Sequence, residues 1–400
     1  MVKFAHIADV HIGGWREPKL RELGYEAFKK AMQICKDKKV DFVLVAGDLF
    51  NTAMPGIDGM KIVVEEFKDL QEVGIPIYLI AGSHDYSPSG KTMLDVLEKA
   101  GLFVNVCKGV DVDGKLQLRF TVDEKTGAKI TGVLGKRSGL DKSIYHDLLL
   151  ESLENEEGYK IFMFHNLLTE FKTKELEKVD SSPLSLLPKK FNYYAGGHVH
   201  IVEQRDVESH GKIVYPGPLF PNSFDELEKL GFGGFFIVDN EKTERVELEM
   251  KKHLGFNISV DGLSVEQADQ KIKETLEGKV FTDVIVTLRV YGTLSMGKPS
   301  DIKFKEMFEF MNSQGAFFIM KNTNKLESKE FETINVETGN VKEIEEKLIK
   351  EHLGQIAVDK DEQKLILGLM ESLSKDKVEG ERVTDYEERM KKEVERIIEL

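Results

Sequence analysis

The chain has 400 residues, 41% apolar and 32% charged, which is enough for two or three domains with buried cores. A net charge of −14 argues against a protein that coats nucleic acid by bulk charge, although bound divalent cations can supply local positive charge at a phosphate site. No stretch reaches the roughly 18 apolar residues of a membrane span. The first residues lack the apolar region of a signal peptide, and two cysteines cannot form a disulfide framework. We therefore expect a cytoplasmic protein without membrane association.

The first 240 residues alternate apolar strand patterns with amphipathic helix patterns. Strands are predicted at 3–8, 41–46, 75–81, 160–164, 192–195 and 234–238. Helices are predicted at 22–36, 59–73 and 91–100. Apolar strands separated by helices indicate an α/β core with buried sheets.

The pattern changes after about residue 240 to that of a small α+β domain. Its strands are predicted at 251–260, 280–291 and 316–320, and its helices at 264–277 and 301–314. The predicted domains are therefore a core at 1–245, a small domain at 250–321, a polar linker at 322–340 and a helical segment at 341–400.

The helical segment 341–400 carries 12 Lys and Arg against 17 Asp and Glu, so it is not a basic DNA-binding arm. Apolar residues recur at helical spacing within it, at Val341, Ile344 and Leu348, at Leu365, Leu369, Met370 and Leu373, and at Met390, Val394 and Ile397. Short helices with one apolar face are marginal in water alone, so these helices need a partner surface. The alternative is that they fold back onto their own chain.

Five short segments place side chains of metal-binding types directly after predicted strands. They are Asp9-Val10-His11, Gly47-Asp48, Gly82-Ser83-His84-Asp85, His165-Asn166 and Gly196-Gly197-His198-Val199-His200. Ligands gather at the carboxyl ends of strands in α/β sheets, so we expect these segments to meet. In Asp-x-His and His-x-His, residues i and i+2 of an extended segment point the same way and can reach one metal.

Each segment alone has an ordinary interpretation. Asp48 suits a helix N-cap, and His165 at a strand end suits a hydrogen-bonded core histidine. Asp9 and His11 suit a turn and a surface histidine. Five such segments together, each after an apolar strand, favour a shared metal site. His6 lies within a strand and is predicted to be structural.

The order of these motifs resembles that of the calcineurin-like metallophosphoesterases, and more closely that of the meiotic recombination 11 (SbcD-type) nucleases of DNA double-strand-break repair. The segments HIADVHIGG, VLVAGDLFN, IYLIAGSHD and YYAGGHVH carry the resemblance, which covers about residues 1–240. It implies an α/β fold with a layered β-sheet core and flanking helices, a small α+β capping domain that contacts DNA, and a C-terminal helical segment.

The resemblance also implies two metal ions, expected to be Mn²⁺. Carried over by motif, one ion is held by Asp9, His11, Asp48 and His200, and the other by Asp48, Ser83, His165 and His198. Mixed imidazole and carboxylate ligands suit Mn, Fe or Zn better than Mg. Two ions roughly 3.5–4 Å apart can lower the pKa of a shared water and clamp phosphate oxygens, which is the chemistry of phosphodiester hydrolysis.

His84 is placed to stabilise the transition state or protonate the leaving group, and Asp85 is expected to orient His84. Two positions depart from the family pattern. Ser83 stands where the family usually has Asn, so we expect a shorter and weaker oxygen ligand for the second metal. Asn51 stands where many members have a His that handles the DNA end, so general phosphodiester cleavage is better supported than exonuclease activity.

Contacts to DNA are predicted at Arg16, after the first metal motif, and at Lys136 and Arg137, after a strand-like segment. A solvated charge pair is the alternative for Lys136 and Arg137. Trp15 could touch the DNA backbone or act as a packing anchor.

The resemblance implies three partners: ends of double-stranded DNA, an SMC-like ABC ATPase bound by the C-terminal segment, and a second copy of the chain. The dimer contact is expected from the helices at 59–73 and 91–100. The alternative is that Phe67 and Leu94 in these helices face their own core.

Three functions are compatible with these patterns. The favoured one is a manganese-dependent DNA nuclease (3′–5′ exonuclease, endonuclease or both) that acts at the nucleoid with an ATPase. A small-molecule or protein phosphoesterase is the second, although protein phosphatases carry GDxVDRG where this chain has GDLFNT. A scaffold whose metal site is impaired by Ser83 is the third.

Overall fold

The computed structural model describes residues 2–87, 92–136, 142–329, 362–375, 377, 381 and 383–399. The chain divides into two compact units. The first comprises Met1–Ser259, Lys271–Tyr291 and Lys303–Lys325, and the second comprises Val260–Gln270, Gly292–Ile302 and Leu326–Leu400.

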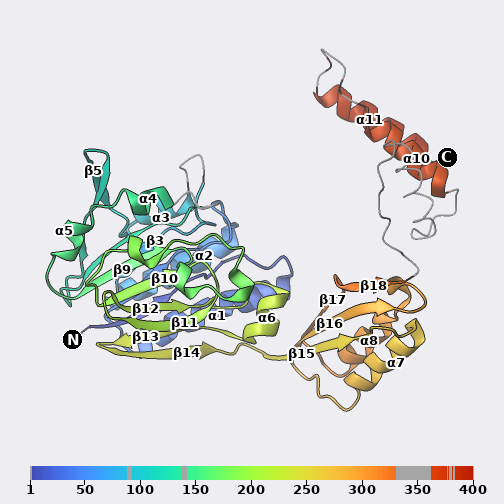
Figure 1. Ribbon diagram of the computed structural model, residues 1–400, viewed down its shortest axis with the longest axis horizontal. Coiled ribbons are helices and arrows are strands. Elements are labelled where there is room, and N and C mark those ends of the chain that lie inside the picture. The colour runs from blue at the N-terminus through green and yellow to red at the C-terminus, as the bar shows by residue number, and fades with distance from the viewer. Residues whose placement is uncertain are drawn as a thin grey trace. The chain divides into compact units, whose positions relative to one another are not determined.

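Two six-stranded sheets form the core of the first unit (Figure 1). The first sheet has the order β14-β13-β1-β2-β3-β4. Its strands are β1 (Lys3–Ile7), β2 (Phe42–Ala46), β3 (Ile77–Ile80), β4 (Val104–Asn105), β13 (Gly233–Asp239) and β14 (Lys242–Leu248). Strands β1 to β4 run parallel, and β13 pairs antiparallel to β1.

The second sheet has the order β11-β12-β10-β9-β8-β7. Its strands are β7 (Thr121–Val122), β8 (Lys129–Val133), β9 (Lys160–His165), β10 (Tyr193–Gly197), β11 (Val202–Val207) and β12 (Gly211–Pro216). Strands β8, β9, β10 and β12 are parallel, so the carboxyl ends of β9 and β10 meet at one edge.

Helices and strands pack in layers because successive strand residues point to opposite faces. In β2, Val43 and Val45 pack beneath α1 (Pro18–Asp37), α2 (Ile57–Glu72) and α3 (Met93–Lys99). Phe42 and Leu44 of the same strand pack against residues of the second sheet, among them Ile161. The layered α/β core predicted from the sequence is confirmed.

The outer face of the second sheet has its own apolar core. It lies under α4 (Lys142–His146), α5 (Leu150–Glu154) and the short 3₁₀ helices η2 (Thr169–Phe171), η3 (Lys174–Leu176) and η4 (Leu184–Leu186). The chain also forms a hairpin of β5 (Gly109–Val112) and β6 (Lys115–Leu118), and helix α6 (Phe224–Leu230).

A third sheet follows, in which β15 (Lys252–Ser259), β17 (Phe318–Asn322) and β18 (Leu326–Ser328) each run parallel to β16 (Val284–Leu294). Its helices are α7 (Val265–Leu276), α8 (Phe304–Ser313) and the 3₁₀ helix η5 (Pro299–Asp301). The described strands of this segment are all parallel and alternate with helices, which is an α/β pattern, whereas a small α+β domain was expected at 250–321.

A short strand lies within the stretch 322–340 that was predicted to be a polar linker. Leu326–Ser328 forms strand β18, in which Leu326 and Ser328 are buried and Glu327 is exposed. Alternation over three residues is too short to stand out in a sequence. Residues 330–340 and the helix expected around Val341 lie outside the described residues.

Two helices are described after the third sheet, α10 (Glu362–Leu373) and α11 (Val383–Glu399). They pack on each other, with Gly368 against Ile397 and with the Ser372 hydroxyl 3.0 Å from a carboxylate oxygen of Glu393. Within the described parts of the chain, no helix combines the length and apolarity needed to cross a membrane.

Candidate metal centre

The candidate ligands lie at the carboxyl ends of β1, β2, β9 and β10, where His165 is the last residue of β9 and the others follow their strands in loops. Several have backbone φ angles in the left-handed region: Asp9 at 50°, His11 at 48°, Asp48 at 51°, His198 at 101° and His200 at 50°. L-residues other than glycine adopt this conformation at an energetic cost, and such strain clusters at functional sites. These five residues are half of the ten non-glycine residues with positive φ in the described chain.

One group of ligand atoms comes from Asp9, His11 and His200, which lie within 4.8 Å of one another. The Nε2 atoms of His11 and His200 face each other at 3.0 Å. The Asp9 carboxylate accepts the backbone N–H of His198 at 2.8 Å, which fixes its orientation. Ring nitrogens that converge beside a carboxylate form the donor set of a divalent cation.

A second group comes from Asp48, His165 and His198, also within 4.8 Å. The His165 Nε2 lies 3.2 Å from Oδ2 of Asp48, and its Nδ1–H donates to the Ala46 carbonyl at 2.8 Å. The same Oδ2 lies 3.6 Å from Nε2 of His11. Asp48 therefore lies between the two groups, as a bridging carboxylate must.

Glycines allow the ligands to approach so closely. Gly47 has a φ of 85°, and a Cβ there would overlap the His165 ring. A Cβ at Gly82 would overlap the carboxylate of Asp48. Any larger residue at these two positions would displace a candidate ligand.

The charges in the centre are strongly coupled. Burial lowers the pKa of His165, but Asp48, Asp9 and the hydrogen bond to Ala46 together outweigh burial and raise the pKa to about 9. Burial dominates at His11, whose pKa falls to about 3 although Asp48 opposes the shift. The neighbouring histidines His200, His84 and His165 lower the pKa of His11 further. Burial opposes ionisation of Asp48 as well, but His165 and His11 hold its pKa below the usual range.

His84 lies beside this centre, with its ring 4.8 Å from that of His11 and its backbone N–H donating to Asp48 Oδ1 at 2.7 Å. We expected Asp85 to orient the imidazole. The structure differs, because His84 Nδ1 bonds to the carbonyl oxygen of Asn51 at 2.9 Å.

The Asp85 carboxylate instead accepts the backbone N–H groups of Leu49, Phe50 and Gly82, at 3.1, 2.9 and 3.0 Å. Asp85 is fully enclosed, and burial raises its pKa to about 7, with the charge of Asp48 adding to the effect. Its contribution is to hold two ligand-bearing loops together.

Ser83, the remaining predicted ligand, is buried between Gly82 and His84. The loop that carries Ser83 contacts Asp48, so Ser83 could join Asp48, His165 and His198 as a ligand. Its role as a ligand stays a prediction. His6 is fully buried and bonds to the hydroxyl of Tyr193 at 3.0 Å, as expected of a structural histidine.

Of the predicted DNA contacts, Arg16 is exposed and Lys136 is half-buried, with its ammonium 6.0 Å from the centre of the Tyr86 ring. Arg137 lies outside the described residues. Trp15 is partly buried against the apolar core, and its indole N–H donates to the carbonyl of Pro221 at 2.8 Å, so packing accounts for it.

Sequence reasoning missed Glu226, whose Oε1 lies 3.0 Å from Nδ1 of His200. Burial lowers the pKa of His200, but Asp9 and Glu226 outweigh it and raise the pKa to about 9. The sequence signal around Glu226 was Ser-x-x-Glu, which indicates only a helix start.

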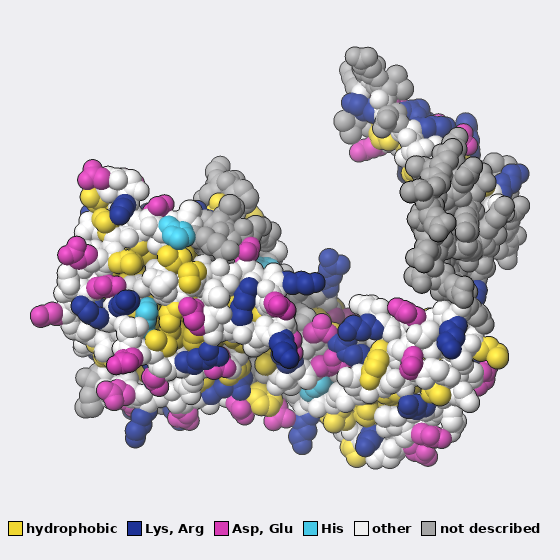
Figure 2. Space-filling view, viewed as in Figure 1, with side chains coloured by type: hydrophobic (Ala, Val, Ile, Leu, Met, Phe, Trp, Pro, Cys, Tyr) yellow, Lys and Arg dark blue, Asp and Glu magenta, His cyan; other side chains and the backbone are white. Residues whose placement is uncertain are grey.

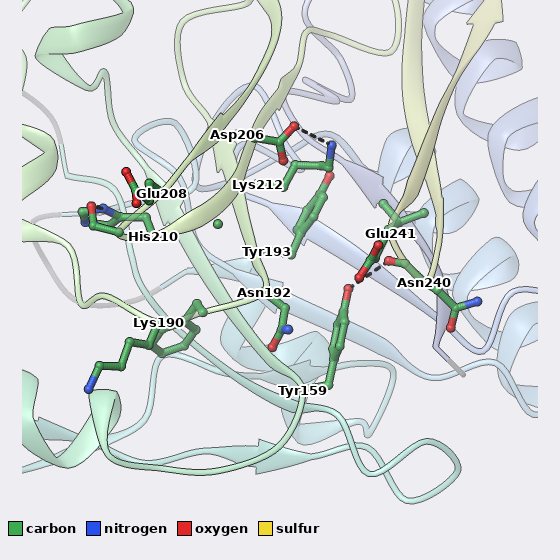
Figure 3. A pocket seen from close by; sticks show the side chains of 14 residues that line it. Tyr159, Lys190, Asn192, Tyr193, Asp206, Glu208, His210, Lys212, Asn240 and Glu241 are labelled. Carbon is green, nitrogen blue, oxygen red and sulfur yellow. Dashed lines mark hydrogen bonds and ion pairs between the residues drawn. The ribbon is translucent and has the colours of Figure 1, made fainter.

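A cavity of about 850 Å³ lies away from this centre, at the amino end of β10 (Figure 3). Tyr159, Tyr193, Lys212 and Asp206 are among its lining residues, and Lys212 pairs with Asp206 at 3.1 Å. The metal-type side chains follow the opposite end of the same strand, so this cavity is not the reaction site.

The layered sheets and the histidine–carboxylate centre at their carboxyl edge define a metallophosphoesterase. Residues 2–202 match the family model of the calcineurin-like phosphoesterases, and the chain belongs to that family. It is accordingly an enzyme that hydrolyses phosphate esters, in a family that uses divalent metal ions.

The chain is further similar to archaeal proteins named DNA double-strand break repair protein Mre11. It is 27% identical to that of Archaeoglobus fulgidus over 69% of this chain and 65% of the relative. Identity is 26% to that of Methanocaldococcus jannaschii, over 96% of this chain and 98% of the relative. The chain is 27% identical to the protein of that name from Methanopyrus kandleri, over 71% of this chain and 64% of the relative. The chain thus spans slightly less than two thirds of the first and third relatives, and the resemblance predicted from the motifs is confirmed.

Proposed function

We propose that this protein is a manganese-dependent DNA nuclease that cleaves phosphodiester bonds during double-strand-break repair. The observation that carries the proposal is the pair of ligand groups, Asp9, His11 and His200 beside Asp48, His165 and His198, joined through Asp48. One carboxylate shared between two imidazole-rich groups is the donor set of a two-metal phosphoesterase centre.

Two divalent ions held by these residues would activate a water near neutral pH and offset the charge of the phosphate oxygens. The chain's own residues do the positioning. The backbone N–H of His198 fixes the carboxylate of Asp9, and the Ala46 carbonyl fixes the ring of His165. Asn51 binds Nδ1 of His84, which leaves Nε2 of that ring to act on the leaving group.

Manganese is the metal that the family resemblance implies, and a donor set of four imidazoles and two carboxylates is compatible with it, because such donors suit Mn, Fe or Zn better than Mg. Ser83 would add a hydroxyl oxygen to the second group. In this proposal the serine weakens that site without abolishing it, because the three other donors remain.

DNA is the proposed substrate because the relatives are named for DNA double-strand break repair. Acidic and basic side chains are intermixed on the face seen in Figure 2, and the net charge is −14. DNA binding would therefore depend on the metal centre and a few local cations, with Arg16, Lys136 and Arg137 as candidates and Asn51 near the scissile end.

In the proposed organisation, residues 1–245 form the nuclease domain and 250–321 a capping domain that contacts DNA. The helices at 341–400 bind an SMC-like ABC ATPase, and a second copy of the chain completes a homodimer. The protein would act in the cytoplasm, at the nucleoid.

The test uses end-labelled linear duplex and hairpin DNA with the metal-stripped chain, with and without Mn²⁺. We expect Mn²⁺-dependent cleavage by the wild type and none by His198→Gln, which removes a ligand. His146→Gln, an exposed histidine away from the centre, is the matched control and should cleave normally.

Cleavage of cyclic nucleotides but not of DNA would favour the small-molecule phosphoesterase. Absence of bound metal by elemental analysis would favour the scaffold.

A further inference from the structure

Glu226 is a carboxylate placed directly behind a candidate metal ligand. Its Oε1 lies 3.0 Å from Nδ1 of His200, while Nε2 of that imidazole faces Nε2 of His11 at 3.0 Å. Carboxylates in this position hold the ring angle and the tautomer of ligating histidines.

The other oxygen of Glu226 fixes the orientation of the carboxylate, because Oε2 accepts the backbone N–H of Asn222 at 2.9 Å. Ser223 caps helix α6 and accepts the backbone N–H of Glu226 at 3.1 Å. A glutamate at this position of a helix usually reaches back to the N-cap backbone. Here one oxygen binds the preceding residue instead, which leaves the other directed at His200.

The turn that carries Asn222 is also tied to the loop after the first metal motif. The indole N–H of Trp15 donates to the Pro221 carbonyl at 2.8 Å, and a side chain at Gly14 would collide with Asn222. Two segments about 200 residues apart in sequence therefore fix the position of Glu226 together.

We propose that Glu226 is a positioning residue for the metal group of Asp9, His11 and His200. Its carboxylate accepts Nδ1–H of His200 and so directs the Nε2 lone pair of that ring toward the ligand atoms of Asp9 and His11. The inference rests on the proposed metal centre and adds a second layer to it. It does not involve the group of Asp48, His165 and His198.

The test is calorimetric titration of Mn²⁺ into the metal-stripped full-length chain, without DNA. We expect Glu226→Ala to weaken one of the two binding steps by about 10–100-fold and to leave the other unchanged. Glu226→Gln should recover much of the loss, because its amide oxygen can still accept Nδ1–H. Asp225→Asn removes a charge from the same first turn of α6 and should bind as the wild type.

Wild-type binding by Glu226→Ala would overturn the proposal. So would equal weakening of both binding steps, since that outcome would assign Glu226 to the stability of the fold and not to one metal group. A wild type that binds two Mn²⁺ but leaves DNA intact would contradict the nuclease function alone. Mn²⁺ binding by the wild type and by Glu226→Ala could still be compared in that case. A wild type that binds no Mn²⁺ would overturn both.

Discussion

Single residues in the centre divide into those that would hold metal and those that would act on the substrate. We propose the second kind of role for His84, whose Nδ1 is occupied by the Asn51 carbonyl and whose ring stands edge-on to His11. The neighbouring Asp85 would neither hold metal nor act on the substrate, because its carboxylate accepts three backbone N–H groups.

For His84→Gln we expect both metals to be retained and the cleavage rate to fall by roughly 10²–10⁴, the usual contribution of a general acid–base group. Glutamine retains a polar side chain but cannot deliver a proton. The measurement is the single-turnover rate on duplex DNA together with the Mn²⁺ content. Near-normal cleavage would remove His84 from the mechanism.

Ser83 is buried, and the backbone N–H of the next residue, His84, donates to the carboxylate of Asp48. We expect Ser83→Asn to lower the Mn²⁺ concentration that gives half-maximal activity, because an amide carbonyl is a longer and stronger oxygen ligand. Ser83→Ala should raise that concentration. If both variants titrate as the wild type does, position 83 contributes no ligand.

At the scale of elements, the sequence pattern predicted the strands that carry ligands and the helices that cover them. Their predicted bounds differ from those in the structure by a few residues. Helix α1, for example, begins at Pro18 rather than Glu22, because Leu20 continues the buried stripe and proline suits a first helical turn. Short strands such as β4 and β18 were missed, since two or three residues carry no readable period.

The centre was predictable to the extent that its ligands lie in short local motifs. Asp9 and His11 are two residues apart, as are His198 and His200, and glycines flank the segments. Glu226 could not be found in this way, because its contact with His200 depends on how the turn before α6 folds. Asn51 was singled out for its side chain, whereas its backbone carbonyl makes the contact with His84.

Helices α2 and α3, the expected dimer contact, bury some of their apolar side chains in their own core and expose others. Phe67 and Leu94 are buried in the core, which was the alternative to a direct role in the contact. Ile57 and Val96 are 67% and 57% exposed instead. The Met93 N–H bonds to the Ala53 carbonyl, so the start of α3 lies close to the segment before α2.

We expect the wild-type chain to sediment as a dimer at micromolar concentration, and Ile57→Glu with Val96→Glu to sediment as a monomer, because charge opposes burial of an apolar contact. Val73→Glu, at a site 59% exposed beyond the end of α2, should remain dimeric. A monomeric wild type would end the proposal of a homodimer.

At the scale of the whole molecule, all the candidate ligands and Glu226 lie in the first compact unit, and helices α10 and α11 lie in the second. The two helices pack on each other yet leave Leu373 63% exposed, with Leu367 and Met370 partly exposed. Amphipathic helices that dock on a partner helix are a common mode of recognition.

We therefore expect a chain that ends at Asn340 to keep Mn²⁺ binding and simple nuclease activity while losing association with the ATPase. The cut preserves β18, whose pairing with β16 a shorter chain would remove. In the full-length chain, Leu373→Glu should weaken the association in the same pull-down assay. A truncated chain that still captures the ATPase, or whose core unfolds, would refute this role for the helices.

The ligands of the candidate centre come from both large sheets: Asp9 and Asp48 follow strands of the first, whereas His165 ends strand β9 of the second and His198 follows β10. An ion held by one donor from each sheet is a cross-link between two layers that otherwise adhere through apolar contact. Metal binding would then stabilise the folded state relative to the unfolded chain. At a free metal concentration 100 times the dissociation constant, such linkage adds about 2.7 kcal/mol to the free energy of unfolding. The centre would thus stabilise the contact between the two sheets at their carboxyl edge in addition to its role in catalysis. Removal of metal by a chelator would then destabilise that edge before the rest of the domain.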